Sequence, residues 1–284
     1  MSCSVVLITG ASSGFGRLTA ETLAHRGHRV FATMRDRSDR NASAAAELNG
    51  LELPEGNEIS VLDLDVNDQA SVDSAVTAVF DAAGQIDVLV NNAGMLCRGM
   101  LESVTVDQAR EQFETNVFGP LRLNRAVLPY MRRQQRGLIV HISSSLGRIV
   151  LPYSGVYAAS KFALEAIAEA YCYELAGSGI ESVIIEPGTF PTDLERKAIH
   201  AQDGGEAGAG SMRPQPSFSR RANPQKVADA IAMLVEMPAG QRPLRTTVGS
   251  DARRLDPLNE FTAELQKRMF SVLGLADMLP GTSG

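Results

Sequence analysis

Short apolar runs, rich in β-branched residues, alternate along the chain with longer stretches of helical periodicity. The apolar runs predict strands at 5–9, 29–34, 59–64, 86–90, 138–143, 180–186 and 244–248. The stretches between them predict helices that include 69–83, 105–135, 157–176 and 224–236. Nearly continuous apolar strands that alternate with helices are typical of a parallel sheet covered on both faces. The pattern therefore predicts one α/β domain, a doubly wound, Rossmann-like parallel sheet of about seven strands.

Two parts of the chain depart from this alternation. Residues 195–223 contain DGGEAGAG and RPQPS, compositions that disfavour a packed element and predict a flexible substrate lid or an insertion without function. The tail predicts one more helix, over 257–270, followed by a loose end. We therefore expect residues 1–255 to bind a dinucleotide and carry catalysis, and residues 256–284 to form a helical tail of the same domain.

The composition narrows the class of partner. Of the 284 residues, 44% are hydrophobic and 21% are charged, as in an ordinary soluble globular protein. The net charge of -6 argues against nucleic acid or an anionic membrane as the main partner. Cys3, Cys97 and Cys172 have no metal-site spacing, so we expect reduced thiols, a cytoplasmic location and no metal. Neither a signal peptide nor a membrane-spanning stretch is predicted.

A glycine-rich turn, TGASSGFG, follows the first predicted strand. Glycines at a strand-to-helix turn let the backbone approach a pyrophosphate, and the helix that begins near Gly14 directs its free N–H groups toward that phosphate. The spacing is neither GxGxxG nor a P-loop. The residues that we expect to bind the cofactor in this turn are Gly10, Ser12, Ser13, Gly14, Phe15 and Gly16.

The stretch YAASK places Tyr157 and Lys161 four residues apart, which on a helix puts both side chains on one face. A phenol with a pKa near ~10 exchanges protons poorly at neutral pH, but a nearby ammonium favours the phenolate and lowers that pKa. Ser144, thirteen positions before the tyrosine, could hold a substrate oxygen in line. The set indicates proton transfer, although the pair alone also fits a surface helix with a solvated lysine.

Taken in order, these motifs resemble those of the short-chain dehydrogenase/reductase family, in its core single-domain branch. The resemblance runs from about residue 5 to 195, and more loosely to about 250. It begins with the Thr-Gly-x-x-x-Gly-x-Gly turn and continues through the NNAG motif at 91–94. The further positions that match the family's cofactor contacts are Asp65, Val66, Asn92, Ala93, Gly94, Pro187, Gly188 and Thr192, beside Tyr157 and Lys161.

The same resemblance implies a catalytic set of Asn116, Ser144, Tyr157 and Lys161. The family's usual spacing to the tyrosine selects Ser144 over its two serine neighbours. In the implied reaction Tyr157 is the general acid or base that interconverts a carbonyl and an alcohol, and Ser144 stabilises the same oxygen. Lys161 would also hold the nicotinamide ribose, and Asn116 would bind a water that leads from Lys161 to solvent.

Cofactor choice depends on the end of the second predicted strand, ATM followed by Arg35. An acidic side chain there binds the ribose hydroxyls of NAD, whereas an arginine accommodates the 2′-phosphate of NADP. Met34 stands roughly where NAD-preferring relatives carry aspartate. The sequence therefore favours NADP over NAD, with Arg35 as the phosphate ligand, helped by Ser12 or Arg37. The alternative is an exposed Arg35 paired with Asp36.

The substrate pocket should lie at the carboxyl ends of the later strands, lined by Tyr153, Phe190 and Leu194. Their apolar character favours a lipophilic ketone, aldehyde or alcohol. VFATMRD and VYAASKFALEAI are similar to stretches of the 17β-hydroxysteroid and retinol dehydrogenase branch. Small residues along 157–176 would permit close approach of another helix. Members of the family pair this helix and the 105–135 helix with those of a second subunit, so the resemblance implies a homodimer or homotetramer.

Two alternatives share the predicted fold. A nucleotide-sensing protein without chemistry usually lacks the tyrosine or the lysine, whereas both are present here. A 3-oxoacyl-carrier-protein reductase fits the catalytic set but accounts poorly for the 195–223 segment and the tail.

Overall fold

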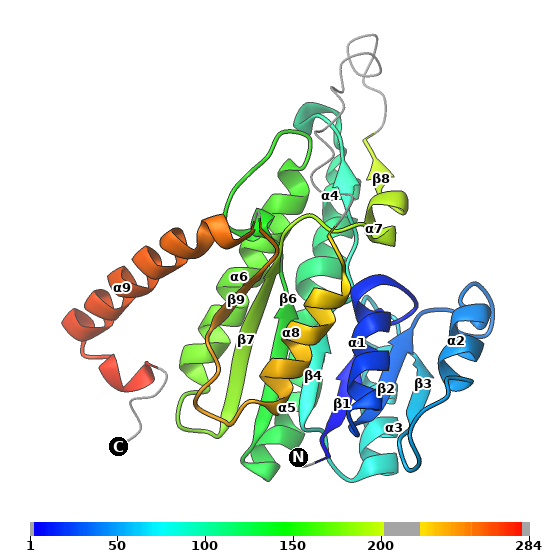
Figure 1. Cartoon of the computed structure of the whole chain (residues 1–284). Helices are drawn as coiled ribbons and strands as arrows, with labels where there is room; N and C mark the ends of the chain where they lie inside the picture. The colour runs from blue at the N-terminus through cyan, green and yellow to red at the C-terminus, as the bar shows by residue number, and fades with distance from the viewer. Residues whose placement is uncertain (1–2, 202–221, 251, 280–284) are drawn as a thin grey trace.

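The computed structural model describes residues 3–201, 222–250 and 252–279, and its centre is a seven-stranded sheet (Figure 1). The strands lie in the order β3-β2-β1-β4-β6-β7-β9, and every neighbouring pair is parallel. The order reverses between β1 and β4, which makes the sheet doubly wound. The strand bounds are β1 Val5–Ile8, β2 Arg29–Met34, β3 Ile59–Asp63, β4 Val88–Asn91, β6 Gly137–Ile142, β7 Ile180–Pro187 and β9 Arg245–Val248. The predicted fold class is confirmed.

Helices cover both faces of this sheet, as the apolar strands require. In β1, Val6 and Ile8 pack on one face with α1, α2 and α8, whereas Val5 and Leu7 pack on the other with α3 and α5. All four side chains are at most 5% exposed. The helix bounds are α1 Gly14–His25, α2 Ala42–Asn49, α3 Gln69–Ala83, α5 Gly119–Gln134, α6 Gly155–Glu174 and α8 Gln225–Glu236.

The helix predicted over 105–135 is interrupted in the structure. It divides into α4 (Val106–Phe113), a π-helical turn (Glu114–Phe118) and α5. A capping box between Thr105 and Gln108 begins α4. The π-helical turn holds Asn116, and such turns occur frequently at functional sites. Periodicity predicted the length of the whole segment, because a single π turn leaves the apolar pattern nearly unchanged.

The expectation that the segment from residue 195 lacks packed elements is wrong for its first residues. A short helix, α7 (Asp193–Arg196), precedes β8 (Ile199–His200), which pairs in parallel with β5 (Cys97–Arg98). The backbone N–H groups of Ile199 and Ala201 donate to Leu96 and Arg98 at 2.8 Å. These hydrogen bonds, rather than residue composition, order the segment. The predicted lid falls mostly on residues 202–221, which lie outside the described residues.

The tail forms a helix, α9 (Asp256–Leu273), longer than the predicted 257–270. It ends at Gly274, whose φ of +71° suits glycine. Figure 1 shows α9 leaning away from the rest of the domain. In the described part of the chain no helix has the length and apolar character needed to cross a membrane. Short 3₁₀ turns occupy Leu101–Ser103, Ser145–Gly147, Ala252–Leu255 and Ala276–Met278.

Candidate active site

A cleft of about 680 Å³ lies at the carboxyl ends of the strands, within the size range of ligand pockets. It brings together most of the residues that the sequence predicted. The predicted residues that line it are Gly10, Ser12, Ser13, Gly14, Phe15, Arg35, Asp65, Val66, Asn92, Ala93, Gly94, Tyr157, Lys161, Thr192 and Leu194. Those that do not line it are Gly16, Asn116, Ser144, Tyr153, Pro187, Gly188 and Phe190.

The glycine turn between β1 and α1 forms one wall of the cleft. Gly10 has a φ of +68° and Gly14 a φ of +59°, values that L side chains rarely adopt. A Cβ on Gly16 would lie 2.4 Å from Asn92 Nδ2 and 2.5 Å from the Gly10 carbonyl oxygen. Gly16 therefore acts through close packing under the turn, which explains its absence from the cleft surface. The first N–H groups of α1 are left for a ligand in the cleft.

Asn92, in the NNAG motif after β4, fastens the glycine turn to the next strand. Its Nδ2 donates to the carbonyl oxygens of Thr9 at 2.8 Å and Gly10 at 3.1 Å. The Thr9 hydroxyl in turn accepts from the backbone N–H groups of Asn92 and Ala93, each at 3.0 Å. The two predicted motifs therefore form one rigid unit, because each satisfies backbone groups of the other.

The ends of β2 and β3 form the far part of the cleft. The Arg35 guanidinium is half exposed and lies 3.8 Å from the Asp65 carboxylate. Asp36 pairs with Arg40 at 3.2 Å, so it is not the partner of Arg35. Arg37 Nη1 donates to the Val61 carbonyl oxygen at 2.6 Å, outside the cleft. The expected help from Arg37 is therefore not seen, and Arg40 lines the cleft in its place.

Some lining residues had no signal in the sequence. Lys197, inside the predicted lid, donates from Nζ to Ser13 Oγ at 3.1 Å and lies 3.6 Å from Asp193. The pairing of β8 with β5 brings this segment back over the glycine turn, and two-residue strands leave no periodic pattern. The lining residues missed in the sequence, from this segment and from other parts of the chain, are Arg40, Asn41, Leu64, Asn67, Glu111, Thr115, Ile142, Asp193, Lys197 and Ile199.

Tyr157 lies in the first turns of α6, 7% exposed, beside the Ser144 hydroxyl. Burial raises the pKa of the tyrosine to about 12, and the Ser144 hydroxyl opposes this by favouring the phenolate. Ser144 Oγ also accepts from the Leu146 N–H at 3.1 Å, which fixes the serine at the start of its turn. Its neighbour Ser143 is buried. Of the two, Ser144 is the serine that interacts with Tyr157.

Lys161 lies one helical turn after Tyr157 and is 5% exposed. Its Nζ donates to the Ile142 carbonyl oxygen at 2.8 Å and lies 5.8 Å from the centre of the tyrosine ring. Burial lowers the pKa of Lys161 to about 8. The sequence predicts that the lysine lowers the tyrosine pKa, whereas in the structure the net change is upward. Burial of the phenol raises its pKa, and the Lys161 ammonium is directed toward the Ile142 carbonyl oxygen instead.

Asn116 supports the site from the π-helical turn. Its Oδ1 accepts from the Met95 N–H at 2.8 Å, and its Nδ2 donates to the Met95 carbonyl oxygen at 3.0 Å and to Ser160 Oγ at 3.1 Å. A Cβ built on Gly94 would lie 3.4 Å from Asn116 Oδ1 and 4.0 Å from Lys161 Nζ. Gly94 therefore lies between the asparagine and the lysine, in a space that a side chain would fill.

The predicted substrate residues differ in placement. Leu194 lines the cleft. Phe190 is buried, and its ring packs edge-on against the Phe15 ring with 5.6 Å between the ring centroids. Its side chain therefore supports the glycine turn. Tyr153 has a φ of +64° in the loop before α6, and its carbonyl oxygen accepts from Gly99 at 3.1 Å. Substrate contact by Tyr153 stays a prediction.

Comparison with known proteins agrees with this geometry. The family model described as short chain dehydrogenase matches residues 4–203. A 3-ketodihydrosphingosine reductase from Bacteroides thetaiotaomicron is 35% identical over 256 residues, which cover 88% of this chain and 89% of that protein.

Solved structures agree as well. A short-chain dehydrogenase from Streptomyces avermitilis superposes with a TM-score of 0.75 at 33% identity, covering 96% of this chain and 98% of its own. An alcohol dehydrogenase from Thermococcus sibiricus, complexed with 5-hydroxy-NADP, has a TM-score of 0.72 at 26% identity, covering 87% and 96%. The chain therefore belongs to the short-chain dehydrogenase/reductase family of NAD(P)-dependent oxidoreductases.

Proposed function

We propose that this protein interconverts a carbonyl and an alcohol with NADP(H), with Tyr157 as the general acid and base. The observation that carries the proposal is the convergence of Tyr157 and Lys161, from α6, on the cleft that the glycine turn also lines. A phenol and an ammonium held beside a phosphate-binding turn form a proton-transfer device next to a nucleotide.

The cleft fits a nicotinamide dinucleotide, which supplies or accepts the hydride when bound. The turn from Gly10 to Gly16 and the N-terminus of α1 would bind its phosphates. Asp65 and Val66, after β3, would contact the adenosine. Thr192 lies beside Gly14 of that turn, with 3.7 Å between its Cβ and a Cβ built on the glycine. We assign Thr192, with Pro187 and Gly188 before it, to the nicotinamide end.

The proton moves at Tyr157 Oη. In reduction Tyr157 donates its proton to the developing alkoxide, and in oxidation it takes the proton back. Ser144 donates a hydrogen bond to the same substrate oxygen and stabilises its negative charge. The raised pKa of Tyr157 keeps the phenol protonated at neutral pH, as reduction requires. Lys161, charged below about pH 8, stabilises the phenolate that remains.

Two arginines support a preference for NADP. Arg35 and Arg40 line the cleft at the end of β2, where the strand ends in Met34 rather than in a carboxylate. An arginine fork binds a phosphate with paired charge-assisted hydrogen bonds. Asp65, 3.8 Å from Arg35, holds the guanidinium near this place. We infer that Arg35 and Arg40 together bind the 2′-phosphate.

We infer that the substrate is a fairly lipophilic ketone, aldehyde or alcohol. Leu101, Val150 and Leu151 are exposed, at 66%, 63% and 36%. A Cβ built on Gly155, at the start of α6, would lie 3.4 Å from Leu101, so this exposed apolar side chain adjoins the helix that carries Tyr157. The Bacteroides relative is named for reducing a keto group on a sphingosine. Both observations favour an apolar carbonyl compound.

The test is a panel of apolar and polar ketones, aldehydes and alcohols, assayed by absorbance at fixed NADPH or NADP concentration. We expect turnover to be highest with the apolar members and with the phosphorylated cofactor. A protein that binds NADPH but turns over no member of the panel would be a nucleotide-sensing protein instead. The cytoplasmic location stays a prediction from cysteine usage.

A further inference from the structure

The third turn of α6 carries a carboxylate that the proposed reaction does not use. Glu165 follows Lys161 by four residues, on the same face of the helix, and is 2% exposed. Burial of a carboxylate is unfavourable unless an opposite charge and hydrogen bonds compensate for it. The groups around Glu165 therefore indicate its role.

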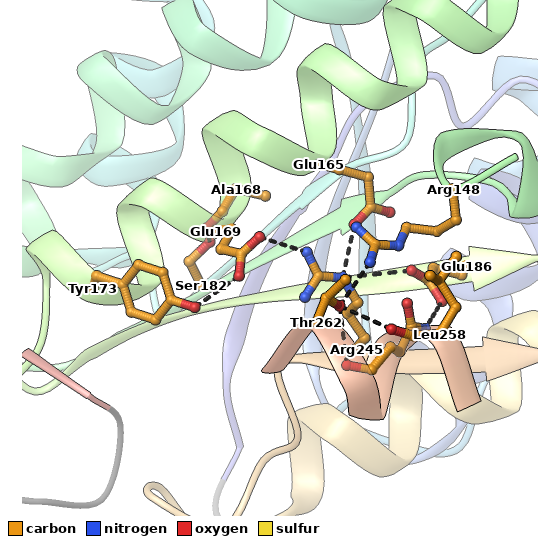
Figure 2. A network of polar contacts seen from close by, with 11 residues as sticks. Arg148, Glu165, Ala168, Glu169, Tyr173, Ser182, Glu186, Arg245, Leu258 and Thr262 are labelled. Atoms are coloured by element: carbon orange, nitrogen blue, oxygen red, sulfur yellow. Dashed lines mark hydrogen bonds and ion pairs between the residues drawn. The ribbon is translucent and has the colours of Figure 1, made fainter. Parts of the chain in front are cut away.

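The compensating charge is Arg245, at the start of β9 (Figure 2). Its Nε lies 3.0 Å from Glu165 and 3.5 Å from Glu186, and its Nη2 lies 2.7 Å from Glu169. Arg245 is 6% exposed and the three carboxylates range from 0% to 13%. One guanidinium thus joins α6 to β7 and β9. Helix α9 closes the group, with Asn259 bonded to Glu186 at 2.6 Å.

The other side of Glu165 faces the turn that leads to Ser144. A Cβ built on Gly147 would lie 2.6 Å from Ser143 Oγ and 3.0 Å from Glu165 Cγ, so the absence of a side chain at Gly147 lets the two approach. The Ser143 hydroxyl favours the ionised form of Glu165. One turn earlier, Lys161 bonds to Ile142. Successive turns of α6 therefore contact the successive residues Ile142 and Ser143.

We propose that Glu165, fixed by Arg245, is a positioning residue that keeps the Lys161 ammonium charged and holds the Ser143 side of the serine turn in place. The proposal rests on the proposed role of Lys161. Glu165 touches neither substrate nor cofactor in it, and acts through Lys161 and Ser143.

The charges around the pair support this assignment. Burial lowers the pKa of Lys161 and the Glu165 charge opposes that effect. Burial raises the pKa of Glu165, and Arg245, Ser143 and Arg148 favour its ionised form. Burial and the charge of nearby Glu165 raise the pKa of Glu186 on β7 to about 7. Further titratable groups that face the pair are Tyr157 and Glu169 on α6 and His141 on β6.

The chain offers a direct measurement because its lysines are only Lys161, Lys197, Lys226 and Lys267. Protein labelled with ¹³C at lysine Cε gives one signal for each, and the signal lost in K161R identifies Lys161. We titrate cofactor-free wild type, E165Q and the matched control E169Q, which removes the other carboxylate that contacts Arg245 on α6. Because no turnover is needed, the result is independent of whether the wild type reduces any carbonyl.

In the wild type Lys161 should titrate near pH 8. In E165Q we expect the pKa of Lys161 to be lower by about half a unit or more, because a nearby negative charge is lost. In E169Q, Lys161 should titrate as in the wild type. In active enzyme the alkaline loss of kcat for reduction should shift downward in E165Q alone. If E165Q does not fold, E165M removes the charge without leaving an amide unpaired. Equal titration of Lys161 in the wild type and the charge-removing variant would overturn the proposal.

Discussion

Lys161 Nζ donates a 2.8 Å hydrogen bond to the carbonyl oxygen of Ile142, the last residue of β6. The bond fastens α6 to the carboxyl end of β6, at the point where the serine turn begins. Tyr157 lies one turn earlier on the same helix, so its place beside Ser144 follows from this attachment. The geometry explains how residues far apart in sequence meet within one cleft.

The cofactor preference should depend on Arg35. We expect the wild type to have a higher kcat/KM with NADPH than with NADH. R35D should lower the NADPH value by about 10- to 100-fold, since a hydrogen bond to a charged group contributes about 1.5–3 kcal/mol. R37A is the control, because Arg37 bonds to Val61 outside the cleft. A wild type that prefers NADH would contradict the assignment of Arg35.

Gly16 should tolerate no side chain. In G16A the new Cβ would meet Asn92 Nδ2 and the Gly10 carbonyl oxygen, so either the turn moves or the helix separates from it. We expect weaker NADPH binding by calorimetry and a lower Tm. G177A is the matched control, because Gly177 has open space around its Cβ position and lies outside the cleft. Because Gly177 has a positive φ, G177A should lower the free energy of unfolding by about 1 kcal/mol without changing NADPH affinity.

Buried His141 should make the fold acid-sensitive. Burial, and then the charge of Lys161, lower its pKa from 6.5 to about 3. Between these values the unfolded chain binds a proton that the native protein does not, so stability is present above pH 6.5 and is lost as the pH falls. One such proton contributes a slope of about 1.4 kcal/mol per pH unit.

The variant H141L tests this linkage by urea unfolding between pH 4 and 7. Neither ring nitrogen of His141 has a hydrogen-bond partner among the described residues, so leucine should be tolerated at pH 7. The slope of stability with pH should be shallower in H141L than in wild type or in H200Q, a change at an exposed histidine. Parallel slopes in all three proteins would exclude His141 as the source.

Helix α6 and the segment 105–135 should form a subunit interface, as the family resemblance implies. Phe118 and Phe162 are 45% and 41% exposed on these two neighbouring elements. We expect a dimer or tetramer by light scattering, and a shift toward smaller species in F162D. V272D, which changes an exposed apolar residue of α9, is the control. A monomeric wild type would refute the interface.

Inner strands such as β1 and β4 could be predicted from sequence because they are buried on both faces and therefore form apolar runs. Helix α3 matches its predicted range, 69–83, where Asp68 caps the start and Gly84 ends it. The π-helical turn that holds Asn116 could not be predicted, since it interrupts hydrogen bonding without breaking the apolar pattern.

The site residues that could be predicted from the sequence are those that belong to recognisable motifs. Lys197 reaches the cleft because a two-residue strand next to it pairs with β5, and Arg40 reaches it from the loop after β2. Neither arrangement has a signal in the local sequence. The predicted downward shift of the Tyr157 pKa was wrong for a related reason. A spacing of four residues shows that two side chains share a face, but not how deeply the phenol is buried.

The most direct test of the proposed reaction is deuteride transfer to a lipophilic ketone from NADPH that carries deuterium at both C4 positions, followed by mass spectrometry of the alcohol. Wild type should give an alcohol one mass unit heavier than with unlabelled NADPH. Y157F should form it about 10²- to 10⁴-fold more slowly while retaining its fold and its NADPH affinity. Unlabelled alcohol from the wild type would contradict hydride transfer from NADPH, and near wild-type turnover by Y157F would contradict the role assigned to Tyr157.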